Sequence, residues 1–188
     1  MTIRSVGVIF WIAVIFFVAN CSGRYRMRRA ERKDNPDNYR CFYRPKFSAE
    51  ERMKNYPFNV AAQVVLTSYE LDFMAKKEGT PDLERVVLSK TQIDSLTDLL
   101  FNNFFKGKTY FVEDVGCFMP RNAIVFVDAS GKEFERADVC FECLNYHTSP
   151  TEFKFGDDCR YKMSLLDPFF ISCGIKIGPR SNKPPEQH

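Results

Sequence analysis

The segment Cys117–Cys143, CFMPRNAIVFVDASGKEFERADVCFEC, decides the fold. Asn122–Asp128 is apolar enough for a central β-strand, and Lys132–Phe141 follows as its partner strand after a turn. The turn is Asp-Ala-Ser-Gly, in which Gly131 can adopt the positive φ that a tight hairpin needs. The segment therefore predicts a β-hairpin with a cysteine at its entrance and a C-x-x-C motif at its exit.

Three further segments are candidates for strands. Phe58–Tyr69 is rich in β-branched and aromatic residues and predicts a strand, and Leu83–Leu88 predicts a shorter one. Tyr110–Val112 is a short strand candidate that leads into the hairpin. The polar stretch Leu144–Gly156, which follows the hairpin, is expected to be a loop.

Two helices are expected beside these strands. Ser89 and Gln92 have the spacing of a capping box, and apolar residues at helical spacing follow over about residues 90–104. A last helix is expected over Cys159–Cys173, with a kink or a restart at Pro168. The sequence therefore predicts an α+β fold, a small antiparallel sheet of three to five strands with both helices packed on one face.

Length and composition indicate one globular domain with flanking segments. The chain has 188 residues, of which 15% are aromatic, including 19 Phe. The net charge of +3 is too small to indicate a nucleic-acid partner, so we expect none. We assign the domain to residues 58–176 and a polar, proline-rich tail to residues 177–188.

The N-terminus has the pattern of a lipoprotein signal peptide over residues 1–20. Arg4 precedes the apolar run Val6–Ala19, and Val-Ala-Asn-Cys then resembles a bacterial lipobox in which Cys21 is lipidated. The alternative is an uncleaved membrane anchor. Fourteen apolar residues span about 21 Å as a helix, which is short of the hydrocarbon core of about 30 Å. The basic residues after the run oppose export under the positive-inside rule, but the short length favours the lipoprotein interpretation.

Residues 21–57 are interpreted as a basic, polar tether. The run Arg24 to Lys33 holds six Arg and Lys residues and has no apolar periodicity. It is either a solvated linker or a segment that lies on anionic lipid headgroups beside the lipidated Cys21. Within the tether, Ser48–Tyr56 has the pattern of a short helix capped by Ser48.

Six cysteines remain if Cys21 carries lipid, and an even number in an exported chain is typical of a disulfide framework. Strand pairing would bring Cys117 close to Cys140 or Cys143, and Cys41 has Cys159 or Cys173 as candidate partners. The six disulfide candidates are Cys41, Cys117, Cys140, Cys143, Cys159 and Cys173.

The same cysteines allow two other interpretations. A zinc site would use Cys117, Cys140 and Cys143, with Cys159 or His147 as the fourth ligand. A thiol-redox site would use the C-x-x-C alone, but this motif ends a strand instead of starting a helix, where the helix dipole would activate the first thiol. We therefore expect structural disulfides and no cofactor, with zinc as the alternative.

Arg121 is the basic residue best placed for a specific role, because it stands at the entrance of the hairpin. It either contacts an anionic ligand or forms an ion pair with Asp138 or Glu142, and the ion pair is the favoured interpretation. No G-x-S-x-G, phosphate-binding glycine loop or H-E-x-x-H motif occurs in the sequence, so we expect no enzymatic activity.

The central motifs resemble those of a known family. Cys21, the run C-x-x-P-R-N-A-I-V-F from Cys117 and the C-F-E-C from Cys140 are similar to an uncharacterised lipoprotein family of Bacteroidetes-type bacteria. The resemblance covers about residues 58–176. It implies a lipid-anchored, extracytoplasmic location and brings no activity with it.

These observations predict a non-enzymatic, lipid-anchored protein of the cell envelope that faces the periplasm or the outer surface. Its expected role is that of a disulfide-stabilised binding or interaction module. Its expected contacts with the membrane are the lipidated Cys21 and the basic run Arg24 to Lys33. The alternative is a periplasmic thiol-redox or zinc-binding protein that uses Cys117, Cys140 and Cys143.

Overall fold

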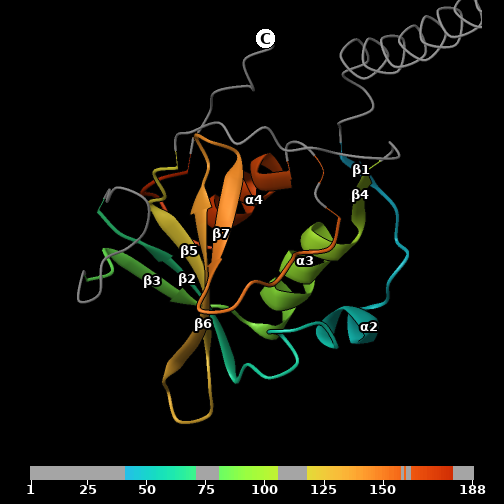
Figure 1. Ribbon diagram of the computed structural model, residues 1–188, viewed down its shortest axis with the longest axis horizontal. Helices are drawn as coiled ribbons and strands as arrows, with labels where there is room; N and C mark the ends of the chain where they lie inside the picture. The colour runs from blue at the N-terminus through green and yellow to red at the C-terminus, as the bar shows by residue number, and fades with distance from the viewer. Residues whose placement is uncertain (1–40, 71–80, 106–117, 158, 160–161, 180–188) are drawn as a thin grey trace, which may run out of the picture. The chain divides into compact units, whose positions relative to one another are not determined.

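The computed structural model describes residues 41–70, 81–105, 118–157, 159 and 162–179, and Figure 1 shows their arrangement. These residues belong to a compact unit that spans Tyr39–His188. The strands in the described part are β1 (Cys41–Tyr43), β2 (Gln63–Ser68), β3 (Glu84–Val87), β4 (Asn103–Phe105), β5 (Asn122–Val127), β6 (Glu133–Cys140) and β7 (Asn145–Ser149). The helices there are α2 (Ala49–Met53), α3 (Lys90–Phe101) and α4 (Lys162–Ser172).

The main sheet of the described chain has five antiparallel strands in the order β3-β2-β5-β6-β7. The predicted hairpin forms its centre, as β5 and β6. Asp128 shapes the turn between them, because its Oδ1 accepts hydrogen bonds from the backbone N–H groups of Ser130 (2.8 Å) and Lys132 (3.0 Å). Gly131 has the expected positive φ, 86°. The α+β prediction is therefore confirmed.

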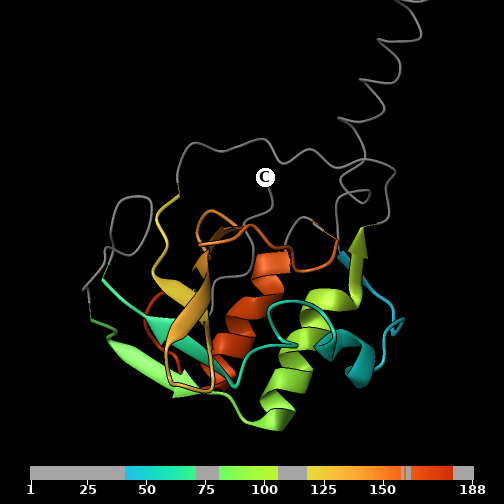
Figure 2. The ribbon, with the colours of Figure 1, turned by 60° about the horizontal axis from the view of Figure 1, so that its bottom comes forward.

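Helices α3 and α4 cover one face of this sheet (Figures 1 and 2). Alternate residues of the strands point toward the helices, as the period of two along a strand requires. Ser89 starts α3 with the predicted capping box, in which its backbone N–H donates to the Gln92 side chain at 2.8 Å. The core between sheet and helices includes Leu66, Ile124 and Phe126 from the strands and Leu96, Leu100, Leu166 and Phe170 from the helices.

Residues that the sequence assigns to the tether, which extends to residue 57, pack with the domain. β1 pairs with β4 in a separate two-stranded sheet, and α2 begins after Ser48 as expected. Arg52 of α2 is buried and forms ion pairs with Asp94 and with Asp98 of α3, the latter at 3.2 Å. A buried arginine holds α2 against α3. Hydrophobic periodicity therefore does not predict that α2 packs on the domain.

Two further boundaries differ from the sequence prediction. β7 lies within the stretch expected to be a loop and pairs with β6 as an edge strand. Its sequence, NYHTS, is polar, and Thr148 is its buried member, so neither length nor apolar content indicates a strand. α4 begins three residues later than expected, and Pro168 lies inside it. The strand candidate Tyr110–Val112 lies outside the described residues.

The segment after α4 is held against the sheet, although the sequence assigned residue 177 to a free tail. The Glu84 carboxylate accepts hydrogen bonds from the backbone N–H groups of Lys176 (3.1 Å) and Ile177 (3.0 Å). Asn122 on β5 donates its Nδ2 to the Ile177 carbonyl at 2.8 Å. These hydrogen bonds hold the C-terminal segment to β3 and β5 through its backbone groups. Amino-acid composition, from which the start of the tail was predicted, does not indicate such bonds.

Candidate functional sites: the cysteines and the polar face of the sheet

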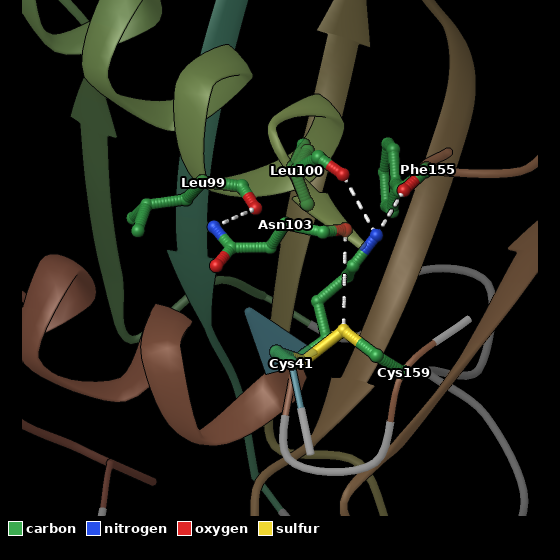
Figure 3. The surroundings of a disulfide bond; sticks show 7 residues. Cys41, Leu99, Leu100, Asn103, Phe155 and Cys159 are labelled. Atoms are coloured by element: carbon green, nitrogen blue, oxygen red, sulfur yellow. Dashed lines mark hydrogen bonds between the residues drawn. A yellow bond between two sulfur atoms is a disulfide. The ribbon is translucent and has the colours of Figure 1, made fainter. Parts of the chain in front are cut away.

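A disulfide bond joins Cys41 to Cys159 across 118 residues of sequence (Figure 3). Cys41 opens β1 and Cys159 precedes α4, and their Cα atoms are 5.0 Å apart, within the usual range for a disulfide. Figure 3 shows the bond beside Asn103, whose carbonyl oxygen lies 4.0 Å from Cys159 Sγ. The bond thus connects β1 to the residue that precedes α4. Cys159 is one of the two partners that the sequence offered for Cys41.

Lys162 lies next to this disulfide and is 3% exposed. Its Nζ donates to the carbonyl oxygens of Leu100 at 2.7 Å and Phe155 at 2.6 Å. The Leu100 carbonyl belongs to the last turn of α3, where carbonyls have no helical partner and a positive charge is favourable. Lys162 therefore caps α3 from within the core. The sequence reading missed it, because lysine is ordinarily a surface residue.

The C-x-x-C motif also forms a disulfide, between Cys140 and Cys143. Cys140 ends β6 and is 1% exposed, whereas Cys143 is half-buried in the turn that follows. The backbone N–H of Cys143 donates to Cys140 Sγ at 3.1 Å. Leu144, next in the chain, has a positive φ of 54°, which completes the reversal into β7.

This pairing differs from the expected bridge between Cys117 and Cys140 or Cys143. The reason is local: the turn after β6 brings the two cysteines of the motif to a Cα separation of 5.2 Å. Cys117 lies outside the described residues. Cys173 is buried with a free thiol, and burial raises the pKa of that thiol, which keeps it in the unreactive neutral form.

The sheet face opposite the helices carries a buried tyrosine that the sequence reading did not single out. Tyr69 extends β2 and donates its hydroxyl to Asp138 Oδ1 on β6 at 2.7 Å. β5 lies between these strands, and two strand spacings amount to about 10 Å, so the Tyr69 side chain must cross β5. The β5 residue in register with Asp138 is Ala123, whose small side chain leaves room for the ring.

Arg136 covers this tyrosine from outside. Its guanidinium carbon lies 5.9 Å from the Tyr69 ring centroid, and its nitrogens bind Glu133 at 2.7 and 3.1 Å and Asp138 at 3.4 Å. Burial raises the pKa of the Asp138 carboxyl, although the hydrogen bond from Tyr69 and the charge of Arg136 offset part of that effect. Burial and the Asp138 carboxylate raise the pKa of the Tyr69 hydroxyl far above its usual range. Arg136, Glu133 and Asp138 thus pack over Tyr69 and the apolar residues of this face, Val65, Ala123, Val125 and Val127.

The interpretation that the sequence favours for Arg121 is an ion pair with Asp138 or Glu142. Asp138 pairs with Arg136 instead, and a pair of Arg121 with Glu142 stays a prediction. Within the described residues, the Arg121 Nε is buried and has no hydrogen-bond partner. A contact between Arg121 and an anionic ligand stays a prediction. His147, the alternative zinc ligand, is exposed on β7 in register with Asp138, and its ring centroid lies 6.3 Å from that of Phe118.

The remaining predicted site residues cannot be placed. Cys21 and the basic run Arg24 to Lys33 lie outside the described residues, as Cys117 does. Among the residues that the structure describes, no three His, Cys, Asp or Glu side chains are grouped to hold a metal ion. No helix in that part of the chain combines the length and the apolar character that a membrane span requires.

Comparison with known proteins adds no relative. No family model matches the chain, and neither does any curated protein or solved structure.

Proposed function

We propose that this protein is a non-enzymatic, lipid-anchored protein of the cell envelope that acts as a disulfide-stabilised binding or interaction module. In this proposal Cys21 carries the lipid and the domain faces the periplasm or the outer surface. The basic run Arg24 to Lys33 adds electrostatic attraction to the membrane. The resemblance to Bacteroidetes-type lipoproteins belongs to the same proposal.

The observation that carries this proposal is the disulfide between Cys41 and Cys159. Long-range disulfides persist in oxidising compartments outside the cytoplasm and are rare within it. Its first cysteine, Cys41, follows in the sequence the segment that would lead to the anchor. A covalent bond at that point supports a domain that must stay folded outside the cell while it is held by its N-terminus.

Lipid attachment is tested by metabolic labelling of the full chain with a fatty-acid analogue in a bacterial host that processes lipoproteins. We expect label in the wild-type chain and none in Cys21→Ser. Membrane association of an unlabelled wild-type chain would mean that the apolar segment itself is the anchor. Recovery of the wild-type chain in the soluble fraction, with Cys41 and Cys159 as free thiols, would contradict the whole proposal.

A second candidate function is thiol–disulfide exchange at Cys140 and Cys143. The observation that favours it is the hydrogen bond from the Cys143 N–H to Cys140 Sγ, which would stabilise Cys140 as a leaving thiolate. A partner thiolate would attack the more accessible Cys143 Sγ and displace Cys140. The second thiol of the partner would then displace Cys143, which leaves the partner oxidised to a disulfide and this pair reduced.

Graded glutathione redox buffers followed by alkylation and mass analysis distinguish the two functions. Exchange predicts a glutathione adduct at Cys143, with Cys140 alkylated and the Cys41–Cys159 bond intact. A purely structural role predicts that both bonds persist until the chain unfolds. A zinc site would require the reduced pair together with Cys117, and equilibrium dialysis of the reduced chain against Zn²⁺ tests it directly.

A further inference from the structure

An unusual number of aromatic side chains lie at the surface around β1. Phe42 is 40% exposed and Tyr43 is 58% exposed, on a strand that has just three residues. Phe42 pairs across the small sheet with Phe104, at a ring-centroid distance of 6.1 Å, and Phe47 lies 6.2 Å from the same ring. The rings of Phe42, Phe47 and Phe104 therefore form one aromatic cluster, in which Phe42 is exposed and Phe47 and Phe104 are half-buried. Tyr43 adds a second exposed ring on the same strand.

Basic side chains border this surface. Arg44 and Lys46 are both exposed in the turn after β1. The Lys46 Nζ lies 4.8 Å from the ring centroid of Phe47 and 5.6 Å from that of Phe104, so the charge stays at the edge of the apolar surface. We define the β1 patch as Phe42, Tyr43, Arg44, Lys46, Phe47 and Phe104.

Two acidic residues near the patch share one basic partner. Asp94 and Asp98 of α3 form ion pairs with the buried Arg52. The Tyr43 hydroxyl also bonds Asp98, and burial followed by the Asp98 charge raises the pKa of that hydroxyl. Asp94, Asp98 and Arg52 together leave one negative charge, and the exposed Arg44 and Lys46 add two positive charges, so this group of five residues is net positive by one charge. Aromatic rings beside basic residues are the chemistry of a membrane–water interface.

The position of the patch in the chain favours a membrane as its partner. It begins directly after Cys41, which the disulfide fixes to the folded unit. Seven residues lie between Lys33, the end of the basic run, and Cys41, and the eight Cα-to-Cα steps from Lys33 to Cys41 span at most about 28 Å. A surface that attracts the basic run thus lies within reach of the patch.

We propose that the β1 patch docks on the anionic lipid headgroups of the membrane that holds the N-terminus. This inference rests on the proposed function, because it assumes a membrane-held chain. It adds that the domain itself contacts the membrane, with Phe42 and Tyr43 at the headgroup level and Arg44 and Lys46 against lipid phosphates. The domain is then oriented, with β1 toward the membrane and β3 on the opposite side (Figures 1 and 2).

Tryptophan fluorescence tests this orientation in the lipidated chain, from which cleavage before Cys21 removes Trp11, the single native tryptophan. Phe42→Trp and Tyr43→Trp each place a unique probe in the patch, and two positions guard against a local folding defect. Val87→Trp, on the edge strand β3 at 54% exposure, is the matched control. Each chain is reconstituted in vesicles of phosphatidylglycerol and phosphatidylcholine with or without brominated acyl chains.

We expect brominated lipid to quench the probes at residues 42 and 43, with emission shifted to shorter wavelength, and to leave the probe at residue 87 unchanged. The quenching should fall in purely zwitterionic vesicles and in Arg44→Glu/Lys46→Glu chains. Flotation of the vesicles distinguishes docking of the β1 patch from anchoring of the chain by its N-terminus. Chains that float without quenching at residues 42 and 43 overturn docking and leave the anchor intact, whereas chains that do not float contradict the proposed function. Equal quenching in zwitterionic and anionic vesicles would overturn the role assigned to lipid phosphates.

Discussion

The two disulfides of the described chain show how one covalent bond can serve different ends. Cys41–Cys159 closes a loop of 118 residues, and Cys140–Cys143 closes a loop of three. In the chain-entropy model the first bond stabilises the fold by about 5 kcal/mol and the second by about 2 kcal/mol. The long-range bond is thus comparable to the total stability of an ordinary domain, roughly 5–15 kcal/mol.

The two disulfides also differ in how much secondary structure surrounds them. The long-range bond lies beside a buried lysine that caps α3, and Cys41 belongs to a strand of three residues. The local bond follows β6, which the sheet already holds on both sides. The comparison predicts that the first bond contributes more to the stability of the fold than the second.

The largest expected effect is the removal of the long-range bond. Cys41→Ser/Cys159→Ser should lower the free energy of unfolding by about 5 kcal/mol, because the unfolded chain regains the entropy of a large loop. Urea denaturation followed by circular dichroism measures the change. A loss no larger than that of Cys140→Ser/Cys143→Ser would break the comparison.

The next effect concerns the lysine beside that bond. Lys162→Met should lower the free energy of unfolding by about 3 kcal/mol, because the carbonyls of Leu100 and Phe155 remain buried and lose their donor. Lys176→Met is the control, since the Lys176 side chain is exposed. Equal urea midpoints for the two variants would show that the hydrogen bonds of Lys162 do not contribute to the stability of the fold.

Removal of the local bond should cost less. Cys140→Ser/Cys143→Ser should lower the free energy of unfolding by about 2 kcal/mol at most, because the bond closes a very short loop. Thermal unfolding under non-reducing conditions measures the change. Failure of this variant to fold would show that the local bond is structural and would remove the case for thiol exchange.

The smallest effect is a pH dependence near the local bond. Asp138 has a raised pKa in the folded state, so the folded state binds its proton more tightly than the unfolded state does. Stability should therefore fall as pH rises from the ordinary carboxyl pKa of 3.8 to the raised value, and stay constant above it. Compared with wild type, Asp138→Asn should gain relative stability over that window.

The pKa of Asp128 is shifted in the opposite direction to that of Asp138, so the two carboxyls change the stability with opposite signs as pH varies. Hydrogen bonds from Ser130 and Lys132 lower the pKa of the Asp128 carboxyl, so its contribution to stability is lost as pH falls through the lowered value. The difference between wild type and Asp138→Asn, measured by urea denaturation at each pH, isolates the buried carboxyl. A difference that does not vary with pH would show that Asp138 titrates normally.

The sequence predicts the elements whose signals are local. The capping box at Ser89, the Gly131 turn and the apolar strand β5 all depend on neighbours in the chain, and the structure has them where expected. The α+β class follows from the order of these elements. Local signals are also why the short helix after Ser48 could be predicted inside an otherwise polar segment.

The site residues depend on distant partners, and the sequence does not show them. Lys162 is buried because two carbonyls from other elements meet there, and Asp138 is buried because Tyr69 reaches it across β5. Nothing in the local pattern distinguishes Arg136 from Arg121, so the sequence offered Arg121, with Asp138 or Glu142 as its partner, and did not show the pair of Arg136 with Asp138. The boundary at residue 57 was wrong for the same reason, since Arg52 holds α2 by ion pairs with α3.

The bond between Cys41 and Cys159 also has a mechanical consequence. Residues 42–158, which include the whole five-stranded sheet, lie inside a covalently closed loop. A force applied between the two ends of the chain passes from Cys41 through the sulfur atoms to Cys159 and bypasses that loop. Stretching can therefore extend the segments outside the loop, but it cannot pull the strands apart until the bond is reduced. A single-molecule pulling experiment would record this as a sharp shortening of the contour length released on unfolding.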